Sequence, residues 1–130
     1  WSDAGKRGVR GGEFHDVGGQ GVAEIVPKDA ACYISVDIEV LDISLVPGCV
    51  SAEPNGMSYA ELRNTLAALT THANVIGFDL VEVNPQLDVG TGTTSYLAAH
   101  TVIEFLGLLC SQPRWAKRRA ERAKQRTARS

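Results

Sequence analysis

The chain has 130 residues and a formal net charge of −2, with 44% hydrophobic and 22% charged residues. These values are typical of one soluble domain that buries a moderate core. The sequence holds no run of 18 apolar residues, so no membrane span is expected, and its first residues lack the apolar segment of a signal peptide. Because its single methionine is Met57, we expect a processed product or a piece of a longer chain.

The charges are unevenly distributed along the chain. Residues 111–130 hold eight Lys or Arg against Glu121 alone, whereas residues 1–110 hold five basic and fourteen acidic groups. Such a basic tail is most often a solvated extension, or an arm that docks on an acidic neighbouring subunit. The sequence disfavours nucleic-acid binding, because Trp115 is the one aromatic residue in the tail and no recognition motif surrounds it.

The three cysteines, Cys32, Cys49 and Cys110, are odd in number and lack CxxC spacing. This argues against a disulfide framework or a zinc knuckle. We expect Cys32 and Cys110 to be small buried hydrophobes. The default compartment is the reducing cytoplasm.

The predicted elements begin after a Gly-rich N-terminal segment, residues 1–30. This segment is expected to be loop, with a short helix or strand over 21–26, and it contains no phosphate-binding glycine motif. A strand is predicted over 31–40, because apolar residues alternate at period two along one face. The apolar positions are Cys32, Ile34, Val36, Ile38 and Val40.

The opposite face of this strand carries Ser35, Asp37 and Glu39. On a strand, the two carboxylates would project from one side about 6.5 to 7 Å apart. A divalent cation such as Mn²⁺ or Mg²⁺ would compensate their charge. The alternative is the ordinary solvent face of a half-exposed strand, and the spacing leaves both readings open.

A long loop over 41–57 follows, and then a helix whose start is clearly marked. Ser58 and Glu61 form a capping box, and Leu62, Leu66 and Leu69 form the buried stripe. A second apolar strand is predicted over 75–83, so the order strand, helix, strand predicts a parallel βαβ unit. A Gly- and Thr-rich turn leads to an apolar helix over 95–109. Pro113 is expected to end the ordered part.

Two segments resemble signatures of the ureohydrolases, the family of arginases and agmatinases. The first follows the spacing of a metal-binding signature, Ser-x-Asp-x-Asp-x-x-Asp with Pro-Gly and a distant Gly, and here consists of Ser35, Asp37, Glu39, Asp42, Pro47, Gly48 and Gly56. The second, similar to the family's Gly-x-Asp-x-Val-Glu-Val-x-Pro segment, runs from Gly77 to Pro85 with Asp88 after it. The resemblance covers about residues 32 to 106.

The resemblance implies an α/β fold, a three-layer α/β/α sandwich with a parallel sheet, of which residues 31–110 form the C-terminal portion and 111–130 a basic tail. It implies a hydrolase of linear amidines that uses two Mn²⁺ ions and releases urea from a guanidino substrate such as agmatine. By resemblance, Asp37 bridges the metals and Glu39 stands where the family has a second metal-binding Asp. Glu82 would pair with the substrate guanidinium, while Ser35 and Asp42 would fix the loop. Pro47-Gly48 favours an agmatinase over an arginase.

This sequence also departs from the family pattern. Glu39 replaces an Asp, and the Gly-Gly-Asp-His and Asp-Ala-His-x-Asp segments that supply most ligands do not occur in the 130 residues. We therefore expect little turnover by the chain alone. It is expected either to join a complementary N-terminal portion or a homo-oligomer, or to be a degenerate non-catalytic assembly partner. Binding through the basic tail is the third hypothesis.

Overall fold

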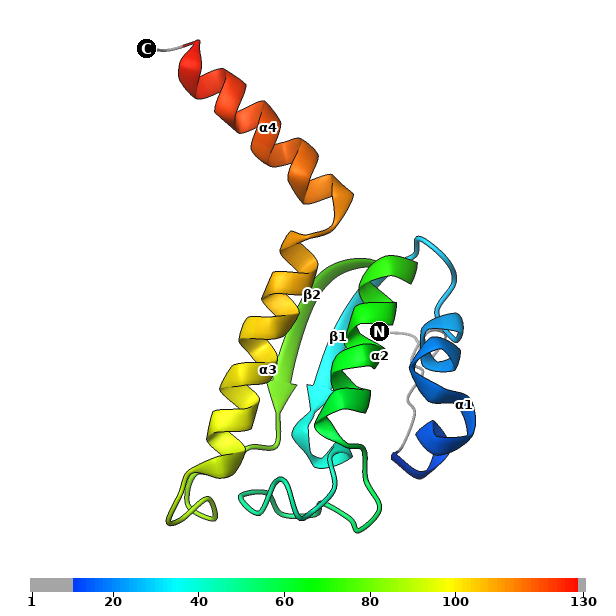
Figure 1. Ribbon diagram of the computed structural model, residues 1–130, viewed down its shortest axis with the longest axis vertical. Coiled ribbons are helices and arrows are strands. Elements are labelled where there is room, and N and C mark those ends of the chain that lie inside the picture. Colours follow the sequence, from blue (N-terminus) through cyan, green and yellow to red (C-terminus); the bar gives the residue numbers. More distant parts are fainter. Residues whose placement is uncertain (1–10, 129–130) are drawn as a thin grey trace, which may run out of the picture.

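The computed structural model describes the backbone of residues 11–128 and the side chains of residues 17–128. Helices alternate with two strands along the chain, as Figure 1 shows. In order, the elements are α1 (Gly11–Glu24), β1 (Ala31–Asp37), the 3-10 helix η1 (Ile38–Val40), α2 (Tyr59–His72), β2 (Asn74–Val81), α3 (Thr93–Cys110) and α4 (Pro113–Thr127).

The strands β1 and β2 pair in parallel, with a register that runs from Ala31 opposite Asn74 to Asp37 opposite Val81. This confirms the predicted βαβ unit, in which α2 is the crossover. The helices α2 and α3 pack together against the sheet (Figure 1). Phe105 of α3 is fully buried and stacks edge-on against Phe78 of β2, with ring centroids 4.8 Å apart.

The first strand is shorter than predicted, since it ends at Asp37 rather than at residue 40. The Asp37 side chain accepts a hydrogen bond from the backbone N–H of Glu39 at 2.9 Å and so caps the 3-10 helix that follows. Ile38 remains completely buried inside that turn. The strand was predicted to be too long because the apolar residues Ile38 and Val40 continue the alternating pattern, although they lie in the 3-10 helix and not in the strand.

The prediction of loop for the Gly-rich segment is wrong for residues 11–20, because residues 11–24 form α1 with a kink at Gly18 (φ 65°), and the short element expected over 21–26 is the end of this helix. Glycine suits this segment because α1 lies close to α2. A Cβ on Gly19 would lie 2.9 Å from the hydroxyl oxygen of Thr65.

The predicted start of α2 is confirmed in detail. The Ser58 hydroxyl accepts from the backbone N–H of Glu61 at 3.3 Å, and the Glu61 carboxylate accepts from the Ser58 backbone N–H at 2.7 Å. The predicted buried stripe, formed by Leu62, Leu66 and Leu69, lies in the core.

The start of α3 depends on a side chain outside the helix. Gly92 at the N-cap has a left-handed backbone and offers no side chain, so the Asp88 carboxylate takes over and accepts from the N–H groups of Thr94 (3.1 Å) and Ser95 (2.8 Å). These hydrogen bonds hold the pKa of Asp88 below its usual value, and the bond from Ser95 has the largest effect.

The loop 41–57 is fixed to the segment after β2 by Gly48. The Gly48 N–H donates to the Thr94 hydroxyl at 2.8 Å, and its carbonyl accepts from the Asn84 N–H at 2.9 Å. A Cβ on Gly48 would lie 2.7 Å from Cγ and 2.8 Å from Cα of Asp88, so a glycine is required at this contact. We call this contact, formed by Gly48, Asn84, Asp88 and Thr94, the loop clamp.

Asp42 holds the loop at its own ends. Its carboxylate accepts from the N–H of Ser44 at 2.9 Å and from the N–H of Asn55 at 2.8 Å. Hydrogen bonds from Ser44 are the main cause that the pKa of Asp42 is lowered. The predicted loop-fixing role of Asp42 is thus in agreement with the structure.

The expectation that Pro113 ends the ordered part is wrong, because Pro113 begins α4, where its missing N–H costs nothing. Gln112 before it is buried and donates to the Thr70 carbonyl at 2.6 Å. Cys110 is exposed and Cys32 half-buried, contrary to the expectation of two buried thiols. Among the residues described, no helix is long and apolar enough to cross a bilayer.

The loop clamp predicts that Gly48→Ala destabilises the fold. Overpacking of this kind costs about 1 to 3 kcal/mol of unfolding free energy, because the methyl group collides with Asp88. Urea denaturation followed by circular dichroism measures this. Gly107→Ala in α3 is the matched control, since its Cβ meets nothing within 4 Å and should stabilise by about 0.5 to 1 kcal/mol. Equal stability of Gly48→Ala and the parent chain would contradict the clamp.

A second prediction concerns acid stability. The pKa values of Asp42 and Asp88 are lowered in the fold, so their ionised forms stabilise it above their unfolded pKa of about 4. That stabilisation is lost as pH falls from about 4 through the folded pKa values. Urea midpoints measured between about pH 6 and pH 2.5 should drop in this window, and the drop should be smaller in Asp42→Asn. An unchanged drop in that variant would show that Asp42 does not contribute.

Candidate active-site edge

The carboxyl ends of β1 and β2 meet at one edge of the sheet. Asp37 is the last residue of β1 and lies opposite Val81, and Glu82 comes directly after Val81. Neighbouring strands lie about 4.8 Å apart, so the backbones of Asp37 and Glu82 are adjacent at this edge. The loop clamp brings loop 41–57 to the same edge. In parallel α/β sheets this edge is where ligands bind.

Glu82 adopts a left-handed backbone with φ 68°, which is uncommon for a residue other than Gly, Asn or Asp. This conformation ends β2 and turns the chain toward Asn84, whose N–H reaches loop 41–57. The Glu82 side chain is exposed. Backbone strain of this kind persists where the surroundings impose it, often at functional sites.

Glu39 lies on η1 and not beside Asp37 on a strand, so the predicted i, i+2 arrangement of two strand carboxylates is wrong. Its carboxylate accepts from the N–H groups of Val50 (3.0 Å) and Ser51 (2.8 Å) and from the Ser51 hydroxyl (2.5 Å). The bonds from Ser51 are the main reason that the pKa of Glu39 is lowered. Glu39 therefore fixes the tip of loop 41–57.

Cys49 shows how closely the acidic groups gather. Its thiol donates to the Val46 carbonyl at 2.9 Å. Burial raises the pKa of this thiol first, and the negative charges of Glu39, Asp37 and Asp88 raise it further. Asp37 at the end of β1, Glu39 on η1 and Asp88 beyond β2 thus all act on one sulfur near the carboxyl edge of the sheet.

The fit of this edge to a pair of Mn²⁺ ions is partial. One oxygen of Asp37 accepts from the Glu39 N–H, and the exposed side chain leaves the other oxygen accessible. Glu39 has both oxygens engaged by Ser51. Within residues 17–128, no group of three or more His, Cys, Asp and Glu side chains has an arrangement that could hold a metal ion. The described residues alone therefore do not fit a two-metal cluster.

His100 and Glu104 lie one turn apart on α3, and their side chains form a surface contact in which Nδ1 and Oε2 are 3.8 Å apart. The Tyr59 hydroxyl donates to Glu104 Oε2 at 2.7 Å and lies 2.7 Å from His100 Nδ1. Arg63 pairs with the other oxygen of Glu104 at 3.3 Å. Burial and the bond to Glu104 raise the pKa of Tyr59 to about 12. These groups join α2 to α3.

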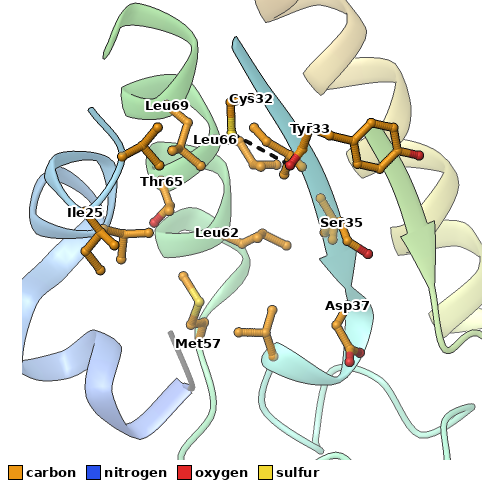
Figure 2. Close-up of a pocket in the computed structure, with 15 residues that line it drawn as sticks. Ile25, Cys32, Tyr33, Ser35, Asp37, Met57, Leu62, Thr65, Leu66 and Leu69 are labelled. Atoms are coloured by element: carbon orange, nitrogen blue, oxygen red, sulfur yellow. Dashed lines mark hydrogen bonds between the residues drawn. The ribbon is translucent and has the colours of Figure 1, made fainter. Parts of the chain in front are cut away.

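A pocket of about 360 Å³ lies between α1, α2 and β1 (Figure 2). Its lining is largely aliphatic, and Asp37 is its sole charged lining residue, at the carboxyl end of β1. A cationic substrate gains little from such walls. The lining of this pocket therefore suits an apolar group rather than a cation.

Sequence reasoning located the edge correctly but missed two of its residues. The loop clamp joins loop 41–57 to the segment that follows Glu82. The roles of Asp88 as the cap of α3 and of Ser51 as the partner of Glu39 were not predicted. Asp88 was visible as an acidic residue shortly before a helix that lacks a capping side chain at Gly92, which is a usable signal. The contact of Ser51 with Glu39 has no comparable signal in the sequence.

Residues 5–107 match the Arginase family. Among curated relatives, a formimidoylglutamase of Halalkalibacterium halodurans is 35% identical over 113 residues, which are 81% of this chain and 35% of that protein. The mitochondrial arginase 1 of Arabidopsis thaliana is 43% identical over 73 residues, 56% of this chain and 21% of that one. The chain thus spans about a fifth to a third of the length of these relatives.

Solved structures agree with this assignment. A hypothetical agmatinase from Burkholderia thailandensis superposes with a TM-score of 0.69 at 28% identity, covering 92% of this chain and 37% of that one. Proclavaminate amidino hydrolase from Streptomyces clavuligerus gives a TM-score of 0.67 at 33% identity, covering 78% and 34%. The predicted arginase-like α/β fold with a parallel sheet is confirmed. Since the family match covers most of its residues, this chain belongs to the arginase family.

Proposed function

We propose that this chain carries part of the active site of a Mn²⁺-dependent, agmatinase-type hydrolase that releases urea from a guanidino substrate. The observation that carries the proposal is the position of Asp37 and Glu82, one from each ureohydrolase-like segment, at the carboxyl ends of two paired parallel strands, where Asp37 lies opposite Val81. Relatives named arginase, agmatinase and formimidoylglutamase support the general class. The agmatinase assignment rests on Pro47-Gly48, where Gly48 fits tightly against Asp88.

Glu82 is proposed to bind the substrate guanidinium. A carboxylate and a guanidinium pair through two parallel N–H···O bonds, which fix the orientation of the planar group as well as its position. The exposed Glu82 side chain leaves its oxygens accessible at the edge. The turn at φ 68° directs the chain after Glu82 into the loop clamp, so the clamp holds the position of this residue.

Asp37 is proposed as a metal ligand through the oxygen that does not cap η1. When bound, paired Mn²⁺ ions supply a metal-activated water for hydrolysis. Glu39 matches a ligand position of the family, but here its carboxylate holds Ser51 and Val50. In this chain its metal role would require release of those bonds.

The remaining ligands are proposed to come from a complementary N-terminal portion that carries the Gly-Gly-Asp-His and Asp-Ala-His-x-Asp segments. The engagement of Glu39 by Ser51 favours a second candidate, in which the chain is a non-catalytic assembly partner of a ureohydrolase. A cytoplasmic location and homo-oligomer formation remain predictions. The two candidate functions predict different activity and Mn²⁺ affinity once the missing metal ligands are supplied by an N-terminal portion.

Complementation should restore activity to this chain. The complement is the N-terminal part of the agmatinase of Halalkalibacterium halodurans, ending where its match to this chain begins. With Mn²⁺, urea release from agmatine should require both polypeptides, because neither holds the full ligand set. Clear turnover by the 130-residue chain alone would show that the ligand count is wrong.

In the complemented enzyme, Glu82→Gln should lower kcat/KM for agmatine by at least about 100-fold. Truncation of one partner of such a charge pair costs about 2 to 5 kcal/mol. Glu53→Gln, at an exposed carboxylate of loop 41–57, is the matched control and should leave kcat/KM nearly unchanged. Equal losses in both variants would remove Glu82 from substrate binding.

Calorimetric titration of the chain with Mn²⁺ separates the hydrolase from the assembly partner. The chain alone should bind weakly, and binding should become tight on addition of the complement and weaken again in Asp37→Asn. Ser51→Ala frees Glu39 and should strengthen binding in the complemented protein. If Mn²⁺ affinity is unchanged by the complement, the chain is an assembly partner and the hydrolase proposal fails.

A further inference from the structure

The helix α4 carries a dense positive charge that the rest of the fold does not neutralise. Its fifteen residues include five arginines and two lysines against Glu121, and none of them is buried. In the described part of the chain, none of the ion pairs formed by side-chain carboxylates involves α4. The helix extends away from the body, at the end opposite the strand-end loops (Figure 1).

The cations of α4 are ordered on the helix surface. At 3.6 residues per turn, residues four apart lie on one face, about 6 Å apart along the axis. Four arginines follow this spacing and form a row about 18 Å long, which we call the arginine row: Arg114, Arg118, Arg122 and Arg126. The opposite face carries small side chains, at Ala116, Ala120, Ala123 and Thr127.

The base of the row is held in place by the fold. Arg114 donates to the Asn74 side chain and to the Val75 carbonyl of β2, and Arg119 donates to the Cys110 carbonyl at 3.2 Å. The guanidinium groups of Arg114 and Arg118 each lie 5.5 Å from the centre of the Trp115 ring. The first turn of α4 is therefore fixed to the sheet, and the arginines beyond it project from an ordered support.

A regular row of guanidinium groups matches the phosphodiester backbone of a nucleic acid. Arginine binds phosphate through two parallel hydrogen bonds, and contacts to the backbone need no sequence motif. The lack of a motif around Trp115 therefore does not exclude this partner once the basic residues form a helix. A polyanion with closely spaced charges can contact successive members of the row at once.

Two other anionic partners fit less well. A membrane-surface helix buries a broad apolar face, whereas the face opposite the row offers only alanine methyl groups and Thr127. The acidic edge of a second copy is the other alternative, but three of its carboxylates, Glu39, Asp42 and Asp88, already accept hydrogen bonds within their own chain, which leaves few carboxylates for a row of four arginines. The phosphates of a nucleic acid, by contrast, are closely spaced along the whole strand, and arginine binding releases their condensed counterions.

We propose that α4 is a nucleic-acid-binding arm that contacts the phosphodiester backbone through Arg118, Arg122 and Arg126, without base specificity. Arg114 and Trp115 serve as its fixed base. The acidic body limits binding to this arm, because the carboxylate-rich edge lies at the far end of the fold (Figure 1). This inference does not depend on the proposed hydrolase.

Fluorescence anisotropy with labelled duplex DNA, duplex RNA and single-stranded RNA tests the arm over a range of salt concentrations. The full chain should bind at about 50 mM salt, and log K against log salt should have a slope of about −3 on duplex DNA, from three phosphate contacts. Arg118→Gln with Arg122→Gln should weaken binding at least about 10-fold and make the slope shallower by about two.

Lys117→Gln with Lys124→Gln is the matched control, since it removes two charges from α4 beside the row and not from it. This pair should change the slope by less than one. Circular dichroism of both double variants checks that α4 stays helical, since glutamine is tolerated well in helices. Equal losses in the two double variants would overturn the row as the binding surface.

Three further outcomes would overturn the proposal. They are no saturable binding to any nucleic acid at about 50 mM salt, tighter binding to vesicles with anionic lipid than to nucleic acid, and self-association by light scattering that the arginine variants abolish. Tighter binding to RNA or to DNA would identify which nucleic acid α4 binds, and either result supports the proposal that α4 binds a phosphodiester backbone.

Discussion

The contact between Gly48 and Asp88 is the constraint on which the strand-end edge depends. Asp88 caps α3, and the same side chain occupies the space that a Cβ on Gly48 would need. The Gly48 backbone then bonds to Thr94 on one side and to Asn84 on the other. The Asp88 carboxylate thus fixes the start of α3, and the Gly48 backbone joins that start to loop 41–57 and to the turn after β2. These segments carry or flank every candidate site residue.

Glu39 shows how one methylene changes what a carboxylate does at this edge. An Asp in the family pattern has a shorter reach, whereas the longer Glu39 side chain accepts three hydrogen bonds from Val50 and Ser51. Backbone amides and a hydroxyl stabilise the ionised form and lower its pKa, as a cation would. The loop tip therefore satisfies Glu39 without a metal, while Asp37 keeps an accessible oxygen.

Parts of the fold that rest on local signals could be predicted from the sequence. The capping box at Ser58 and Glu61 and the apolar stripe of α2 involve neighbours within one or two turns, so the pattern was sufficient. The end of β1 could not be predicted from the sequence. An apolar residue at position 38 is expected whether the chain continues as a strand or turns into the 3-10 helix that forms, because Ile38 is buried in either case. Pro113 was ambiguous because proline is compatible with the end of one helix and with the first position of the next.

The candidate site was predictable to the level of its place and its residue types. The two ureohydrolase-like segments located Asp37 and Glu82 at the strand ends, and parallel pairing brought them together. The partners of those carboxylates depend on contacts between residues far apart in the sequence. Ser51 reaches Glu39 across twelve positions and Thr94 reaches Gly48 across forty-six, and no local pattern encodes either contact.

Charge in this molecule is separated along its length, and this separation affects how its two surfaces can act. Asp37, Glu39 and Glu82 follow one another around the strand ends, while α4 holds seven cations. Figure 1 shows that α4 lies at the end of the molecule opposite the strand-end loops. Exposed charges farther apart than a Debye length of about 8 to 10 Å are largely screened at physiological salt. The arm therefore gains little from the acidic edge of its own fold, and the edge gains little from the arm. Each surface can therefore bind a counter-charge independently of the other, as the two proposals require: a cation at the edge and a polyanion along the arginine row.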